Sequence, residues 1–130
     1  MIIGIGTDII KTARFEGMTE RFIARVFTPN ERAYLLAKSH VSAAGLFAAK
    51  EAIAKALGTG FRGFWPDQIE ICHDDLGKPY VILHKEAALT AKKLAKRKRR
   101  FYRGYLISLS ISHTDTDAVA FAVISAIGRL

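Results

Sequence analysis

A chain of 130 residues with 50% hydrophobic content is long enough for a single core, and we expect one domain over residues 1–130. Its 20 lysines and arginines against 12 acidic residues give a formal net charge of +8, which favours an acidic partner: a phosphorylated small molecule, a nucleic acid, an acidic protein or an anionic membrane. The single cysteine, Cys72, excludes an intrachain disulfide and is typical of a reducing cytosol. The first residues lack a signal-peptide pattern, and no apolar run approaches the roughly 20 residues of a membrane span. We therefore expect a cytoplasmic protein that does not insert into membranes.

The first predicted element is a buried strand over residues 2–10, in which isoleucines surround two glycines and one charge, Asp8. An aspartate at the end of an apolar run often caps a helix or a turn, so Asp8 alone does not indicate a site. Gly4 and Gly6 resemble the start of a dinucleotide-binding motif, but Ile9 occupies the third glycine position and no helix opens there. We therefore exclude that motif.

Two helical segments are predicted next. Residues 11–27 have apolar side chains at helical spacing, with three arginines on the opposite, exposed side. Thr28, Pro29 and Glu31 form the pattern of a capping box with proline at the first helical position, and this second helix is predicted to run to about Lys38.

The central predicted helix covers residues 43–57, which are rich in strong helix formers and are preceded by two possible serine caps, Ser39 and Ser42. Gly58 supplies a C-terminal stop. At 100° per residue, Lys50, Glu51 and Lys55 fall within an arc of roughly 140°, and the rest of the helix surface is apolar. We expect a helix buried on most sides with one charged stripe, which faces solvent, another chain or a ligand because unpaired buried charges are costly.

The C-terminal half is predicted to contain two strand pairs around a helix. Strands at about 68–73 and 79–83 flank a turn, an amphipathic helix covers residues 85–96, and strands at 105–111 and 118–124 form a hairpin. His73 has no second histidine or cysteine at metal-ligand spacing, so we interpret it as an ordinary strand residue. These elements favour an α+β fold, with helices covering one face of a mainly antiparallel sheet.

Four motifs, in this order along the chain, resemble the family of holo-acyl-carrier-protein synthases, which are short bacterial 4′-phosphopantetheinyl transferases. The motifs are Ile5-Gly6-Thr7-Asp8-Ile9, Phe47-Ala48-Ala49-Lys50-Glu51-Ala52 with Lys55, Gly58-Thr59-Gly60, and Ser110-Ile111-Ser112-His113. The resemblance implies the 4′-phosphopantetheinyl transferase fold. It also implies transfer of the phosphopantetheine arm of coenzyme A to a serine of an acyl carrier protein, with release of 3′,5′-ADP, in fatty acid biosynthesis.

The resemblance implies that Asp8 and Glu51 bind Mg²⁺ and that both act in catalysis together with Lys55. This assignment fits the chemistry, because displacement at a diphosphate requires its negative charge to be neutralised. Mg²⁺ is commonly held by a few carboxylates together with phosphate oxygens and water. Lys55, one turn after Glu51, would reach a phosphate as a point charge. Either Glu51 or a metal-bound water would deprotonate the incoming serine, and the sequence does not separate these alternatives.

The family's coenzyme A contacts fall on eight positions of this chain: Lys50, Lys55, Gly58, Gly60, Lys78, Pro79, Ser112 and His113. For Lys50 the alternative is exposure to solvent, for His113 a surface histidine in a turn, and for Lys78 and Pro79 a simple tight turn. The family docks its acidic carrier protein on a basic first helix, which corresponds here to Arg14, Arg21 and Arg25. A merely solvated basic face is the alternative for these arginines.

Two positions depart from the family pattern. Leu46 replaces an arginine that would contact the 3′-phosphate of coenzyme A, and Lys11 replaces an acidic residue shortly after Asp8. The family also implies a homotrimer with active sites between subunits, in which one subunit supplies Asp8, Glu51 and Lys55 and its neighbour closes the nucleotide pocket.

A small nucleic-acid-binding protein is the alternative function. It would use Lys92–Arg103, where the basic run Lys96–Arg100 is followed by Phe101 and Tyr102. Because these basic residues are clustered in one segment and aromatic residues are not spread over a sheet face, we favour the transferase and expect no nucleic-acid partner.

Overall fold

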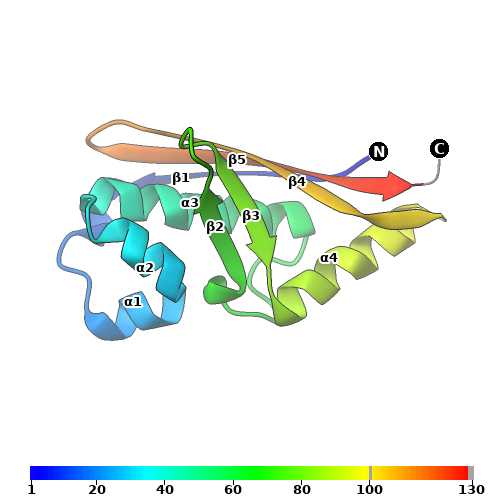
Figure 1. Cartoon of the computed structure of the whole chain (residues 1–130), viewed down its shortest axis with the longest axis horizontal. Coiled ribbons are helices and arrows are strands. Elements are labelled where there is room, and N and C mark those ends of the chain that lie inside the picture. Colours follow the sequence, from blue (N-terminus) through cyan, green and yellow to red (C-terminus); the bar gives the residue numbers. More distant parts are fainter. Residues whose placement is uncertain (100, 129–130) are drawn as a thin grey trace.

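The computed structural model describes residues 1–99 and 101–128 and has an α+β fold in which helices lie on one side of an antiparallel sheet (Figure 1). The larger sheet has three strands in the order β1-β5-β4, and a second sheet consists of β2 and β3. Every pairing is antiparallel. The strands are β1 (Ile2–Lys11), β2 (Ile69–His73), β3 (Pro79–Leu83), β4 (Tyr102–His113) and β5 (Asp117–Gly128). The predicted fold class and both predicted strand pairs are therefore confirmed.

The central helix, α3 (His40–Leu57), packs against the inner face of β1 and β5. It begins after Ser39, whose side chain accepts a hydrogen bond from the backbone N–H of Val41. It ends at Gly58, whose φ of 84° is a left-handed conformation that favours glycine. Twelve of its residues are buried, which confirms that this helix forms the centre of the core.

The predicted helical segment over residues 11–27 is divided into two pieces. A short 3₁₀ turn, η1 (Thr12–Phe15), is followed by Gly17 at a φ of 64° and then by α1 (Glu20–Val26), whose N-cap is Thr19. The prediction of one continuous helix is wrong here because Gly17 turns the chain and the Thr19 side chain accepts from Phe22 N–H, starting a new helix.

The remaining helices follow the predictions closely. The helix α2 (Pro29–Leu35) has both hydrogen bonds of the predicted capping box, between Thr28 and Glu31, and ends about one turn earlier than expected. The helix α4 (Lys85–Lys98) follows β3, and a short 3₁₀ turn, η2 (Pro66–Gln68), precedes β2. Within the described residues, no helix is both long and apolar enough to cross a lipid bilayer.

The outer face of β1 and β5 carries exposed apolar side chains, since the helices lie on the other side of the larger sheet (Figure 1). Gly6 and Ile10 of β1 point inward and are buried, whereas Ile5 and Ile9 are 63% and 71% exposed. The predicted burial of the first strand is therefore wrong for one of its two faces. Phe121, 49% exposed, extends this apolar surface onto β5.

Candidate functional site

Two glycines let strand β1 lie directly on helix α3. A Cβ atom at Gly4 would come within 1.9 Å of the carbonyl oxygen of Ala56, and one at Gly6 within 1.9 Å of that of Ala52. Because side chains alternate along a strand, Asp8 shares this inward face with the two glycines. The close approach therefore brings the Asp8 carboxylate to the surface of α3, next to the turn that carries Glu51 and Lys55.

Asp8 and Lys55 form an ion pair across this contact. The Lys55 Nζ lies 3.1 Å from Asp8 Oδ1 and also donates a hydrogen bond to the backbone oxygen of Thr7 at 2.9 Å. The Asp8 side chain is only 17% exposed, whereas that of Lys55 is 52% exposed. Strand β1 therefore meets the charged turn of α3 within one subunit.

Glu51 completes a cluster of two carboxylates. Its side chain is half-buried, and this burial raises the pKa of the Glu51 carboxyl, as does the negative charge of Asp8. Lys55 and Arg14 are close enough to act in the opposite direction. The ionised form of Glu51 is therefore disfavoured at this position, and a bound cation would stabilise it.

The donor set of this cluster fits Mg²⁺. No group of three His, Cys, Asp or Glu side chains suitable for a metal ion occurs in residues 1–99 and 101–128, and the Asp8–Glu51 cluster offers two carboxylates. Mg²⁺ is typically bound through one or two carboxylates and completes its octahedron with water and substrate phosphates. A two-carboxylate site suits this ion when a diphosphate is also bound.

Lys50 does not belong to the charged stripe that the sequence predicted. Its side chain is fully buried, and its ammonium donates to Glu31 Oε1 at 2.8 Å, to the Pro66 carbonyl at 3.0 Å and to the Ile69 carbonyl. Burial lowers the pKa of the Lys50 ammonium, although the Glu31 carboxylate opposes this shift. The prediction that Lys50 contacts coenzyme A is wrong, because all three of its protons are used inside the core.

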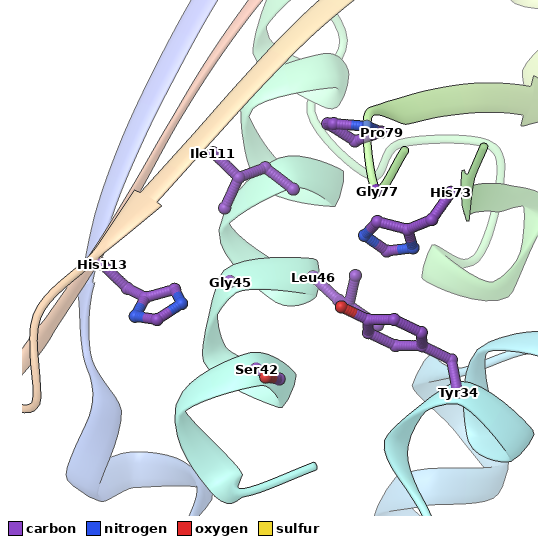
Figure 2. A pocket seen from close by; sticks show the side chains of 9 residues that line it. All are labelled: Tyr34, Ser42, Gly45, Leu46, His73, Gly77, Pro79, Ile111 and His113. Atoms are coloured by element: carbon purple, nitrogen blue, oxygen red, sulfur yellow. The ribbon is translucent and has the colours of Figure 1, made fainter. Parts of the chain in front are cut away.

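A hollow of about 190 Å³ lies beside the N-terminal half of α3 (Figure 2). Figure 2 shows His113 and Ile111 of β4 on one side of it and Tyr34, His73 and Pro79 on the other, with α3 between them. The rings of Tyr34 and His73 are stacked at a centroid distance of 4.2 Å and an angle of 10°. The hollow contains two of the predicted coenzyme A contacts, Pro79 and His113, together with Leu46.

Tyr34 and His73 are candidate site residues that sequence reasoning missed. Burial lowers the pKa of the His73 imidazole, and the nearby positive charge of Lys38 lowers it further. Lys38 Nζ also lies 5.3 Å from the centroid of the Tyr34 ring. Tyr34 lies on α2 and His73 on β2, and the two residues form no sequence motif. They come together only because α2 packs against β2.

The other predicted coenzyme A contacts do not line this hollow. Gly58 and Gly60 follow the far end of α3 at φ values of 84° and 59°. Gly58 comes thirteen positions after Gly45, which lies in the hollow, a distance of about 20 Å at 1.5 Å per residue. Lys78 and Ser112 are exposed beside lining residues. Within one subunit, the predicted contacts thus fall into two separate groups.

The three predicted docking arginines are all exposed. Arg21 and Arg25 lie on α1, whereas Arg14 belongs to η1, so they do not share one helix. Arg14 lies near enough to Glu51 to lower the pKa of its carboxyl, which places the basic surface next to the two carboxylates. Lys11, which replaces the family's acidic residue, forms a 2.8 Å ion pair with Asp117 of β5.

The basic segment Lys92–Arg103 covers the end of α4 and the start of β4, and Arg100 lies outside the described residues. Lys92, Lys93, Lys96, Arg97 and Lys98 are exposed on α4. Lys96 Nζ lies 5.9 Å from the Tyr102 ring centroid, so one aromatic residue of the segment pairs with a lysine of the same segment.

Comparison with known proteins gives a consistent result. The sequence profile of the 4′-phosphopantetheinyl transferase superfamily matches residues 4–110. A holo-[acyl-carrier-protein] synthase of Clostridium beijerinckii is 47% identical over 132 aligned residues, covering 98% of this chain and 100% of that protein. One from Clostridium perfringens strain SM101 is 43% identical over 129, covering 95% and 94%.

Solved structures agree with these sequence matches. The crystal structure of a holo-(acyl-carrier-protein) synthase from Bacillus anthracis in complex with CoA (3′,5′-ADP) superposes with a TM-score of 0.76 at 36% identity, covering 98% of this chain and 99% of that one. The synthase of Helicobacter pylori in complex with coenzyme A gives a TM-score of 0.74 at 32% identity, covering 93% and 99%. The nucleic-acid-binding alternative finds no support in these similarities.

Proposed function

We infer that this chain, which belongs to the 4′-phosphopantetheinyl transferase superfamily, moves the 4′-phosphopantetheine group of coenzyme A to a serine of apo-acyl carrier protein. The products are the holo-carrier protein and 3′,5′-ADP. The observation that carries the inference is the convergence of Asp8 and Lys55 at 3.1 Å with Glu51 beside them, in a chain that matches these synthases over nearly its whole length.

In this proposal, Asp8 and Glu51 hold Mg²⁺. The raised pKa of Glu51, caused by burial and by the Asp8 charge, supports a cation between the two side chains. The chemistry that Mg²⁺ would supply there is neutralisation of negative charge on the diphosphate of coenzyme A. Lys55 is exposed enough to turn from Asp8 toward a phosphate oxygen and to add a positive charge there.

The reaction is a substitution at the β-phosphorus of coenzyme A. The serine oxygen of the carrier forms a new bond to that phosphorus, and the bond to the bridging oxygen breaks, so that 3′,5′-ADP leaves with the electron pair. The serine proton must be accepted as the bond forms. Glu51 is the chain's own candidate acceptor, since its carboxylate lies in the acidic cluster at which the diphosphate would bind.

The hollow of Figure 2 is the proposed site for part of the nucleotide half of coenzyme A. Pro79 and His113 were predicted for this role, and Tyr34 and His73 add a stacked aromatic surface beside them. His113 is exposed and free to approach an anionic group. Lys78 and Ser112 flank the hollow. The backbone N–H groups of Gly58 and Gly60 donate to the carbonyls of Lys55 at 2.9 Å and Ala54 at 3.1 Å, so these glycines would offer a close approach to coenzyme A and no free amide donor.

We propose a homotrimer with active sites between subunits. One group of predicted coenzyme A contacts lines the hollow beside the N-terminal half of α3, and the other follows its C-terminal end, which fits a site whose halves come from neighbouring copies. The outer face of β1 and β5 supplies an apolar surface for association, with Ile5, Ile9 and Phe121 all at least 49% exposed.

Carrier docking is assigned to Arg14, Arg21 and Arg25, which are all exposed, and Arg14 also lies near Glu51. Acyl carrier proteins present acidic helices in this family, so the basic surface is complementary in charge. The single-domain organisation and the cytoplasmic location expected from the sequence remain predictions.

The proposed activity is tested by incubating the protein with coenzyme A, Mg²⁺ and an apo-acyl carrier protein, followed by mass spectrometry of the carrier. We expect the carrier mass to increase by one phosphopantetheinyl group, and 3′,5′-ADP to form in equal amount. No increase under conditions in which a known synthase modifies the same carrier would overturn the assignment.

A further inference from the structure

The buried surface of α3, the helix that carries Glu51, consists mostly of small side chains. Seven of its twelve buried residues are alanines, including the adjacent pairs Ala43–Ala44 and Ala48–Ala49. Its contact with β1 is made of glycine against alanine. Small side chains allow a close approach and so determine the distance between α3 and β1. Because these side chains are similar in size, they constrain the rotation of α3 about its axis less strongly.

Lys50 differs from the other buried residues of α3 because its side chain makes specific polar contacts. Its buried ammonium is held by acceptors from three directions: the Glu31 carboxylate of α2, the Pro66 carbonyl of η2 and the Ile69 carbonyl of β2. A displacement of α3 by one residue, or a rotation by 100°, would remove the lysine from all three acceptors and leave a buried charge unpaired.

Glu31 is itself fixed independently of Lys50. Its Oε1 accepts from the Thr28 backbone N–H at 2.8 Å, and its Oε2 accepts from the Ile71 backbone N–H at 2.8 Å. The carboxylate is thus bonded to the start of α2 and to the middle of β2 before the lysine is counted. It forms a rigid acceptor against which the orientation of α3 is set.

Lys50 and Glu51 are consecutive residues, so the direction of one side chain determines that of the other. Successive side chains on a helix point about 100° apart. With Lys50 fixed toward α2 and β2, Glu51 is directed toward the face where Asp8 and Arg14 act on it. The same rotation of α3 therefore determines both the Lys50–Glu31 contact and the position of Glu51 relative to Asp8.

We propose that the buried Lys50–Glu31 ion pair is a positioning device that sets the rotation of α3 so that Glu51 meets Asp8. This inference rests on the proposed metal-binding role of those two carboxylates. Lys50 contacts neither the substrate nor the metal in this account and acts only through Glu51. A buried ion pair is well suited to such a task, because it selects one register while adding little net stability over a well-packed apolar pair.

The test uses the double variant Glu31→Gln with Lys50→Met, which removes both charges and keeps similar volumes. Single removal of either charge is less informative, since it leaves the partner's charge buried alone. The full-length variant is compared with wild type for melting temperature, for kcat in carrier modification, and for Mn²⁺ affinity measured by electron paramagnetic resonance with coenzyme A present. A control, Ile53→Val or Ile53→Ala, is chosen to match the loss in melting temperature, because Ile53 is buried on the same helix and has no polar contact.

A misplacement of about 1 Å at a reacting group can lower a rate by roughly 100-fold. We therefore expect the double variant, folded at the assay temperature, to lose at least about tenfold in both kcat and Mn²⁺ affinity. The Ile53 control should stay within about twofold of wild type in both. Values of the double variant within twofold of wild type, or an equal loss in the control, would overturn the proposal.

Two further variants keep the result decisive. If the double variant does not fold, Glu31→Gln alone decides: a loss of kcat and Mn²⁺ affinity larger than in the control supports the proposal, and wild-type values overturn it. Glu51→Gln in the same assay separates this inference from the proposed function. Wild-type Mn²⁺ affinity in Glu51→Gln would refute the metal site itself, whereas loss there with no loss in the double variant would refute only the positioning role.

Discussion

The backbone of Gly6 lies so close to Ala52 that a Cβ atom on the glycine would stand 1.9 Å from the alanine carbonyl oxygen. This contact joins the strand that carries Asp8 to the helix that carries Glu51 and Lys55. The two glycines of β1 are therefore part of the site, although they touch no predicted ligand. Their role is to let two backbones approach without intervening side chains.

Gly6→Ala should separate β1 from α3, because the obstructing atom is backbone and cannot rotate away. We expect a loss of about 1–3 kcal/mol or more in the free energy of unfolding, and a large loss of transferase activity. Gly104→Ala is the matched control, since a Cβ there meets no atom within 4 Å and its φ is not positive. Denaturant unfolding and carrier modification measure both effects. Equal behaviour of the two variants would contradict the close-packing account.

Glu51 should make the metal-free protein less stable as the pH rises. Its pKa in the folded protein is raised by burial and by Asp8, so the unfolded chain loses this proton at a lower pH than the folded one. The contribution of protonated Glu51 is present below the unfolded pKa and is lost as the pH rises through the folded pKa. Glu51→Gln, which cannot ionise, should lack this loss.

Melting curves in a chelator, recorded between pH 4 and pH 8, check this prediction. We expect Glu51→Gln to gain melting temperature relative to wild type as the pH increases. Added Mg²⁺ should stabilise wild type at neutral pH and leave Glu51→Gln almost unchanged, because a ligand stabilises only the state that binds it. A parallel pH dependence of the two proteins would show that ionisation of Glu51 does not destabilise the folded protein.

Arg14→Glu should weaken carrier binding. Reversing one exposed charge on a basic docking surface raises the KM for the carrier, by about tenfold or more where the contact is close, while the KM for coenzyme A changes little. Lys92→Glu is the control with the same charge change, on α4 at the other end of the molecule from α1 (Figure 1). An unchanged carrier KM in Arg14→Glu would remove this residue from the docking surface.

Phe121→Glu should break the proposed trimer by placing a charge in the exposed apolar face of β5. Sedimentation velocity is expected to give a trimer for wild type and a monomer for this variant, with loss of activity because each proposed site combines residues of two subunits. Leu36→Glu, at a residue 88% exposed on another surface, should leave the trimer intact. A monomeric wild type with full activity would contradict the interface.

The sequence was sufficient to predict most of the local structure, because each signal is local. The capping box at Thr28 and Glu31, the helix stop at Gly58 and the hairpin between β4 and β5 all depend on neighbouring residues. The family motifs also placed Asp8, Glu51 and Lys55 in one site, whereas the ion pair between Asp8 and Lys55 was not predicted.

The interpretation of Lys50 was wrong for a physical reason. Helical periodicity gives the angle between the Lys50 and Glu51 side chains. It does not show which of the charged side chains on α3 is buried and hydrogen-bonded to acceptors of other elements. Glu31, its partner, is 19 residues away and had already been explained as half of a capping box. The Tyr34–His73 stack was missed for a similar reason, since it exists only through tertiary packing.

The central claim is that Asp8 and Glu51 together hold the cation on which transfer depends. The most direct measurement is the Mg²⁺ dependence of phosphopantetheine transfer, read as carrier mass, in wild type, Asp8→Asn and Glu51→Gln with folding checked by circular dichroism. The account predicts transfer in wild type that is lost in chelator, and two folded variants with no measurable Mg²⁺-dependent turnover. Wild-type turnover in either variant would contradict it.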